Sequence, residues 1–107
     1  MVAQISPRDL YKSLENGLSV RLIDVRQPWE NDIATLPGSV LIPLNELPQR
    51  AQEISRDQTE VVVYCHHGIR SLSAAGYLQR IGFINVKSLA GGIDAWSCEI
   101  DPDIPRY

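Results

Sequence analysis

The sequence predicts an α/β protein built on one mainly parallel sheet with helices on both faces. Short apolar runs rich in β-branched residues, such as residues 61–64, are typical of buried strands. Stretches with a helical spacing of apolar residues separate these runs, and parallel strands need such crossovers. No internal repeat, low-complexity segment or linker interrupts the 107 residues. A single domain over residues 1–107 is therefore expected.

The first helix is expected to begin after Ser6. A serine side chain accepts hydrogen bonds from a first helical turn, and Pro7 suits the first helical position. Asp9 adds a capping partner and a negative charge to the same turn. Gly17 follows Asn16 and is a typical stop signal. We therefore expect a helix between Ser6 and Asn16.

The longest expected helix covers residues 71–81. Its apolar residues recur at the i, i+3, i+4, i+7 spacing of a stripe that faces a core, and Gly82 follows as a stop signal. Weaker signals predict short helical segments at residues 27–30, 44–54 and 91–96. The stripe consists of Ala74, Tyr77, Leu78 and Ile81.

Strands are expected at residues 20–25, 40–42, 61–64 and 84–89. Ligands of such sheets bind at the carboxyl ends of the strands. Two of these ends carry polar residues, because Asp24 and Arg26 end the first strand and Cys65 follows the third. We expect Asp24 and Arg26 to form a structural ion pair, since charges near a buried strand need partners. A position for Arg26 at the rim of the pocket stays open.

Cys65 begins a short loop between an apolar strand and a helix. The backbone N–H groups of a tight loop, together with a helix N-terminus, favour a negative charge. Arg70 adds a full positive charge at the end of this loop. Both effects lower the pKa of a thiol. We therefore expect Cys65 to be a nucleophile and Arg70 to bind an oxyanion of the substrate.

Four sequence motifs, in this order, resemble the single-domain rhodanese family of sulfurtransferases. Residues 22–26 match its Asp-Val-Arg strand, and residues 36–39 match its Ile-Pro-Gly-Ala turn. Residues 65–71 match its Cys-x-x-Gly-x-Arg-Ser loop, and residues 91–96 match its Gly-Gly-x-x-x-Trp motif. Each motif alone is weak evidence, but the four together at the right separations are specific.

The resemblance implies a five-stranded sheet and the transfer of a sulfane sulfur through a persulfide on Cys65, without a cofactor. The implied donor is thiosulfate or the persulfide of a protein such as a cysteine desulfurase. The implied acceptor is a thiol, cyanide or a sulfur-carrier protein. Residues 99–107 also resemble rhodanese domains fused to enzymes that activate sulfur carriers of the molybdopterin and thiamine types. The chain has Ala34 and Thr35 where the family often has Gly-His, so any contact of that histidine is missing or replaced.

The other loop residues are expected to bind substrate: His66, His67, Gly68, Ile69 and Ser71. Gly68 permits a turn with positive φ, which brings N–H groups inward. Ser71 either starts the helix or donates its hydroxyl to the persulfide. The two histidines either rim the pocket, adding positive potential at lower pH, or are ordinary exposed loop residues.

No metal site is expected at the two histidines. Adjacent side chains on a tight loop usually point in different directions, and the sequence contains only 2 histidines. A catalytic zinc site generally has three protein ligands.

The composition favours a reduced, cytoplasmic monomer. The formal net charge is -3 and no apolar stretch could span a bilayer, so neither nucleic-acid nor membrane binding is expected. No signal peptide is indicated. Cys65 ends a core strand and Cys98 lies near the C-terminus, so a disulfide between them is not expected. Cys98 is either an incidental cysteine, the simpler interpretation, or a thiol that resolves the persulfide.

Two other functions use similar residues. Phosphatases and arsenate reductases of the tyrosine-phosphatase type have a Cys-x5-Arg spacing, whereas four residues separate Cys65 from Arg70. The shorter loop suits a sulfur atom better than a tetrahedral phosphate. A non-catalytic binding module commonly lacks the nucleophile, whereas Cys65, Gly68 and Arg70 are all present. A sulfurtransferase is favoured, and both alternatives stay open.

Overall fold

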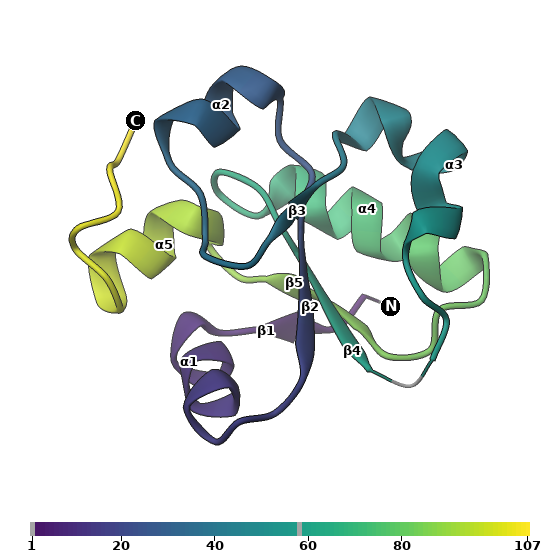
Figure 1. The fold of residues 1–107 in the computed structure, drawn as a ribbon, viewed down its shortest axis with the longest axis horizontal. Coiled ribbons are helices and arrows are strands. Elements are labelled where there is room, and N and C mark those ends of the chain that lie inside the picture. Colours follow the sequence, from purple (N-terminus) through teal and green to yellow (C-terminus); the bar gives the residue numbers. More distant parts are fainter. Residues whose placement is uncertain (1, 58) are drawn as a thin grey trace.

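A computed structural model describes residues 2–57 and 59–107, and these form one five-stranded sheet with helices on both faces (Figure 1). The strand order is β1-β5-β4-β2-β3, and every neighbouring pair of described strands is parallel. The predicted α/β fold is confirmed, and the sheet is wholly parallel. The strands are β1 (Gln4–Ile5), β2 (Val20–Asp24), β3 (Val40–Leu41), β4 (Glu60–Tyr64) and β5 (Val86–Leu89).

Helices α1 and α5 pack against each other on one face of the sheet, and α4 lies on the opposite face against β4 and β5 (Figure 1). None of the helices in the described residues is long and apolar enough to span a membrane. The helices are α1 (Pro7–Glu15), α2 (Pro28–Ile33), α3 (Leu47–Arg50), α4 (Ile69–Arg80) and α5 (Gly92–Glu99), with 3-10 turns η1 (Leu44–Glu46) and η2 (Ala51–Glu53) beside α3.

The central strand β4 contributes to two hydrophobic clusters, one on each face of the sheet. Val61 and Val63 belong to the cluster beneath α4, whereas Val62 and Tyr64 belong to the cluster beneath α1 and α5. Burial on both faces explains why β4 is a continuous apolar run without polar alternation. Cys65 continues the alternation and lies on the α4 side.

Strands β2 and β4 end side by side. Asp24 is in register with Tyr64, and the N–H of Val25 donates to the carbonyl of Tyr64 at 3.0 Å. The segment after Val25 and the loop after Cys65 therefore leave the sheet at the same edge. This edge is the carboxyl end of the strands, where open α/β sheets bind ligands.

The first helix begins as predicted. Ser6 accepts a hydrogen bond from the N–H of Asp9 at 3.1 Å, and α1 starts at Pro7. The strand β1 before it was not predicted. It has only two residues, exposed Gln4 and buried Ile5, and so short an element has no readable periodicity.

The helix expected over residues 71–81 begins earlier, at Ile69. Gly68 has a φ of 104°, in the left-handed region, and this turns the chain from the loop directly into the helix. Arg70 consequently lies in the first turn of α4, together with Ser71, rather than in the loop before the helix.

Other element bounds also differ from expectation. The strand expected from residue 84 begins at Val86, and Ile84 before it is 83% exposed. The last helix continues beyond Trp96 to Glu99. The segment expected at residues 44–54 is divided into η1, α3 and η2, and Pro48 lies in the first turn of α3, where an N–H group would have no helical acceptor.

Candidate active site

The sulfur atom of Cys65 lies among inward-facing donors. The N–H of Gly68 donates to Sγ at 3.1 Å, and the N–H of Ser71 donates to it at 3.3 Å. The Ser71 hydroxyl lies 3.5 Å from Sγ and is the acceptor when Cys65 carries its proton. Two backbone amides aimed at one sulfur favour negative charge on that atom.

The first turn of α5 determines how the loop is oriented. The N–H of Ile93 donates to the carbonyl of Cys65 at 2.9 Å, and the N–H of Asp94 donates to the carbonyl of His66 at 3.1 Å. These contacts hold the two carbonyls on the α5 side. A Cβ atom on Gly92 would lie 2.4 Å from the His66 carbonyl oxygen, so this close approach requires glycine.

A buried pair of serine hydroxyls contacts the sulfur through Ser71. The hydroxyls of Ser71 and Ser88 are 2.7 Å apart, and both residues are fully buried. Ser71 also donates to the carbonyl of Gly68 at 3.2 Å. Ser88 was not predicted to belong to the site. Its only sequence signal is a hydroxyl within an apolar strand, which equally fits a residue bonded to the backbone.

Arg70 forms a two-point ion pair with Glu30. Its two terminal nitrogens lie 2.7 and 2.8 Å from the two carboxylate oxygens. Hydrogen bonds from Arg70 lower the pKa of Glu30 to about 2, and the same bonds raise the pKa of Arg70. Glu30 is only 3% exposed and remains ionised at neutral pH. Sequence reasoning missed Glu30 because it lies 40 positions before Arg70 in the chain.

Asp24 and Arg26 form a fully buried ion pair. The Arg26 Nε and one terminal nitrogen donate to the two Asp24 oxygens at 2.8 and 2.6 Å. Arg26 also donates to the carbonyl of Ala34 at 2.6 Å and to that of Glu30 at 3.3 Å. The pair thereby attaches the α2 segment to the end of β2.

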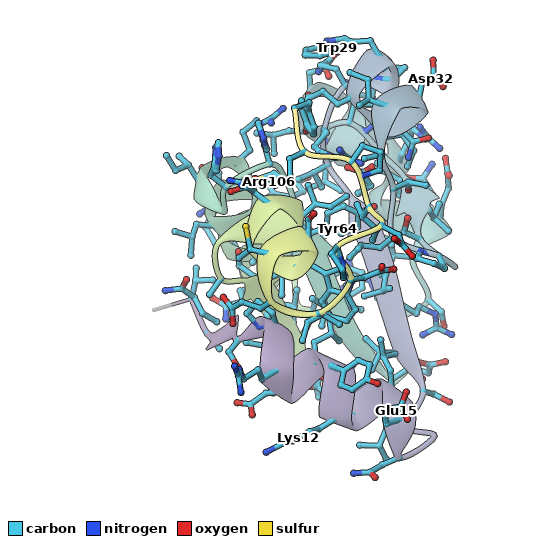
Figure 2. The ribbon with its side chains drawn as sticks, turned by 90° about the vertical axis from the view of Figure 1, so that its left-hand side faces the viewer. Lys12, Glu15, Trp29, Asp32, Tyr64 and Arg106 are labelled. Carbon is cyan, nitrogen blue, oxygen red and sulfur yellow. The ribbon has the colours of Figure 1, made fainter. Side chains whose placement is uncertain are left out.

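Tyr107 connects these two ion pairs. Its hydroxyl accepts a hydrogen bond from Arg26 at 3.0 Å and donates one to Glu30 at 2.8 Å. Burial raises the pKa of Tyr107 to about 12, so this donor keeps its proton. Figure 2 shows the C-terminal segment (yellow) rising from α5 toward α2, where Trp29 forms an edge contact with the Tyr107 ring. We call Asp24, Arg26, Glu30, Arg70 and Tyr107 the polar network.

The expectation that the two histidines point in different directions is wrong. Their rings stack at a centroid distance of 3.9 Å with an interplanar angle of 23°. The ring of His66 also stacks on Tyr107 at 3.9 Å, and this continuous stack aligns the histidines. Burial lowers the pKa of His66, which shifts any positive potential from this imidazole toward more acidic pH.

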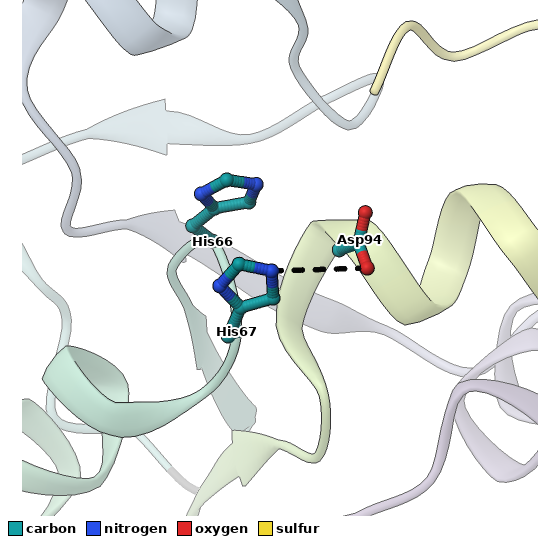
Figure 3. Close-up of side chains that lie close together, drawn as sticks. All are labelled: His66, His67 and Asp94. Carbon is teal, nitrogen blue, oxygen red and sulfur yellow. Dashed lines mark ion pairs between the residues drawn. The ribbon is translucent and has the colours of Figure 1, made fainter. Parts of the chain in front are cut away.

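His66, His67 and Asp94 form the one group of close potential metal ligands within the described residues. His67 Nε2 lies 3.8 Å from an Asp94 oxygen (Figure 3). The nitrogen lone pairs of stacked imidazoles lie in nearly parallel ring planes. The lone pairs of two ligands of one ion must instead point at a common position. Asp94 already accepts hydrogen bonds from Arg106 at 2.8 and 3.3 Å. The side chains are arranged as a stack with an ion pair rather than as a ligand set.

Thr35, which replaces the family's histidine, belongs to a hydroxyl cluster. Its Oγ1 lies 3.1 Å from the Ser39 hydroxyl and 3.2 Å from the Tyr64 hydroxyl. The turn after α2 is therefore attached to the end of β4 without an imidazole.

The remaining predicted residues differ in exposure. Ile69, beside Arg70, is 78% exposed, whereas Cys65 is 1% exposed. Both cysteines are free thiols, and Cys98 lies exposed on α5. The sulfur of Cys65 is thus surrounded by donors and almost closed to solvent.

The model of the rhodanese-like domain family matches residues 6–99. A sulfurtransferase from Allochromatium vinosum is 37% identical over 97 residues, which cover 91% of this chain and 90% of that protein. The probable adenylyltransferase/sulfurtransferase MoeZ of Mycobacterium tuberculosis is 38% identical over 105 residues, and these cover 96% of this chain. The chain spans only 26% of the length of MoeZ and 38% of a rhodanese-like/PpiC domain-containing protein from Arabidopsis thaliana.

Solved structures show the same fold. A rhodanese-related protein from Thermoplasma volcanium matches with a TM-score of 0.81 at 31% identity, over 96% of this chain and 95% of that one. The human single-domain sulfurtransferase TSTD1 matches with a TM-score of 0.81 at 26% identity, over 92% of this chain and 98% of that one.

Proposed function

The chain belongs to the rhodanese-like domain family of sulfurtransferases, and on that premise we propose that it carries sulfane sulfur as a persulfide on Cys65. The observation that supports this most directly is the pair of N–H groups, from Gly68 and Ser71, that point at Sγ. They stabilise the negative charge of the thiolate in the manner of an oxyanion hole, and in our proposal the loop also holds the terminal sulfur of the persulfide, which carries the charge in that form.

In the first half-reaction the Cys65 thiolate attacks the outer sulfur of the donor. A new S–S bond forms on Cys65, the sulfur–sulfur bond of the donor breaks, and the leaving group keeps the electron pair. In the second half-reaction a nucleophilic acceptor attacks the terminal sulfur and regenerates the thiolate. Neither step in this proposal uses a cofactor, and the attacking group is the thiolate form of Cys65.

The donors that we propose are thiosulfate and thiol or protein persulfides, the latter supplied by an enzyme such as a cysteine desulfurase. The acceptor is a thiol, with cyanide as its assay substitute, or a sulfur-carrier protein. The similarity to MoeZ, named a probable adenylyltransferase/sulfurtransferase, supports a carrier protein. A cytoplasmic location and a monomeric state remain predictions.

The loop residues have separate proposed roles. Gly68 and Ser71 hold the persulfide through their amides, and the Ser71 hydroxyl can turn toward it from 3.5 Å. Exposed Ile69 and His67 are available to contact a donor or acceptor. Phosphoryl or arsenate chemistry is less well supported. It needs an arginine whose donors are free to bind a tetrahedral anion, whereas Arg70 is bound to Glu30.

Intact-mass spectrometry after incubation with thiosulfate or a persulfide tests the function. The wild-type protein should gain one sulfur that cyanide or a thiol removes. Cys65→Ser should gain none, and the matched control Cys98→Ser should behave as wild type. Loading of Cys65→Ser at the wild-type level would contradict the assignment of the nucleophile.

The burial of Cys65 makes a second measurement decisive. Cys65 is 1% exposed, so a donor must enter between the surrounding side chains to reach Sγ. Iodoacetamide should alkylate Cys65 in folded Cys98→Ser protein, where no other thiol competes. A thiol that is neither alkylated nor loaded with sulfur would belong to the inert buried cysteines, and the non-catalytic binding module would then be favoured.

A further inference from the structure

The carboxylate of Glu30 lies at the candidate active site but has no part in the mechanism above. It follows the start of α2 and accepts hydrogen bonds from Arg70 at 2.7 and 2.8 Å. The N–H of Gln27 donates to it at 2.9 Å, and the hydroxyl of Tyr107 donates at 2.8 Å. With these four bonds Glu30 cannot swing away from Arg70 without breaking its bonds to Gln27 and Tyr107.

The charges around Cys65 consequently cancel. The positive charge of Arg70 is paired with Glu30, and that of Arg26 is paired with Asp24. Burial lowers the pKa of His66, next to Cys65, and so disfavours a positive charge on this imidazole. What remains to attract a negative group is the pair of backbone amides, which suits one charged sulfur atom but supplies little attraction for a dianion.

We propose that Glu30, held by Tyr107, is a specificity-determining residue that cancels the charge of Arg70 and makes the site favour thiol persulfides over the thiosulfate dianion. This inference rests on the proposed persulfide chemistry of Cys65 and names the class of donor that the same site accepts. It assigns roles to two residues, Glu30 and Tyr107, that lie outside the Cys65 loop.

The two donors differ in charge rather than in bond chemistry. A thiolate and a protonated thiol persulfide, RSSH, give a protonated Cys65 persulfide and RS⁻, with one negative charge on each side, or two when the persulfide is deprotonated throughout. A thiolate and thiosulfate give a deprotonated Cys65 persulfide and sulfite, with three negative charges on each side. The second reaction gathers more negative charge at a site where Glu30 already neutralises Arg70, so little Coulomb attraction favours it.

Tyr107 keeps the carboxylate in place. Its ring packs against His66 at 3.9 Å and meets Trp29 edge-on at 6.1 Å, and its hydroxyl joins Arg26 to Glu30. Arg106 anchors the same segment to Asp94 on α5 (Figure 2). Loss of the Tyr107 hydroxyl leaves Glu30 with three of its four bonds. We therefore expect a smaller effect on donor choice than from loss of the Glu30 carboxylate itself.

The experiment compares single-turnover sulfur loading of Cys65 from thiosulfate, a dianion, and from the persulfide of N-acetylcysteine methyl ester, which carries at most one negative charge. The readout is the ratio of the second-order rate constant of loading from thiosulfate to that from the persulfide. Glu30→Gln should raise this ratio about tenfold, because an uncompensated Arg70 attracts the dianion. Tyr107→Phe should raise it about threefold. Glu46→Gln, which removes an exposed carboxylate paired with Arg50, should leave it unchanged.

A measurement on the wild-type protein keeps the proposal testable if Glu30→Gln does not fold. The wild-type rate constant of loading should be higher for the persulfide, and the rate constant for thiosulfate should not fall as salt rises from about 20 to 200 mM. A fall with salt would reveal a net attractive field and overturn the proposal, as would an unchanged ratio in folded Glu30→Gln. If neither donor loads Cys65, the proposed function itself fails and this inference fails with it.

Discussion

The Cys65 loop and the polar network behind it are assembled in opposite ways. The loop is one continuous segment, residues 65–71, whose amides converge on a single sulfur atom. The network brings together side chains from β2, α2, α4 and the C-terminal segment, and Arg26 and Tyr107 are 81 residues apart. The loop supplies the reactive group, whereas the network sets the charge around it and attaches α2 and the C-terminal segment to the sheet.

This difference has an energetic consequence. Contacts within the loop are mostly hydrogen bonds from backbone N–H groups to Sγ, and the chain reaches this arrangement by a turn of positive φ at Gly68. The network contains buried charges, and each loses its hydration whether or not its partner is present. Damage to the network should therefore reduce stability most, and damage to the loop should reduce sulfur transfer most.

The largest expected effect is that of Arg26→Met. This change leaves Asp24 buried without its counter-charge and leaves the carbonyl of Ala34 without a donor. The free energy of unfolding should fall by about 4 kcal/mol in urea denaturation. The control is Arg21→Met, which breaks the exposed pair with Asp57 and should leave stability unchanged within error. Equal effects of the two changes would contradict the distinction between buried network and surface pairs.

Acid should weaken the network through Glu30. Its pKa in the folded protein is about 2, below the ordinary value of 4.5, mainly because Arg70 donates hydrogen bonds to the carboxylate. The ionised group therefore stabilises the fold above pH 4.5, and this contribution disappears as pH falls from 4.5 toward 2. It is on the order of 3 kcal/mol. Denaturation of wild type and Glu30→Gln at several pH values should show a stability gap that narrows on acidification, and a constant gap would exclude this linkage.

The variant Gly92→Ala tests the Cys65 loop separately from the polar network. A Cβ atom at Gly92 would lie 2.5 Å from the carbonyl oxygen of Cys65, at a φ of +63°. Gly38 also has positive φ, but a Cβ atom there has no neighbour within 4 Å. Gly92→Ala should therefore destabilise by about 2 kcal/mol more than Gly38→Ala, and only Gly92→Ala should slow sulfur loading of Cys65. Equal loading rates in the two variants would show that the loop tolerates displacement from α5.

Several features of the fold were readable from local sequence. The apolar run of β4, the Ser6 cap and the stripe of α4 each depend on neighbouring residues, and each is present. The start of α4 was placed two residues too late, since the turn depends on the left-handed conformation of Gly68. The strand β1 was missed because two residues carry no period and its pairing partner β5 lies far along the chain.

By itself the sequence determined the fold class, the family and the segment that holds the candidate nucleophile, because periodicity and a seven-residue motif are properties of adjacent residues. Only the tertiary structure decided what surrounds that segment. Glu30, Ser88 and Tyr107 come from distant parts of the chain, and no local pattern indicates that they meet. The stacking of His66 on Tyr107 and the neutral pairing of Arg70 are likewise products of packing, since charge balance depends on distances in space rather than along the chain.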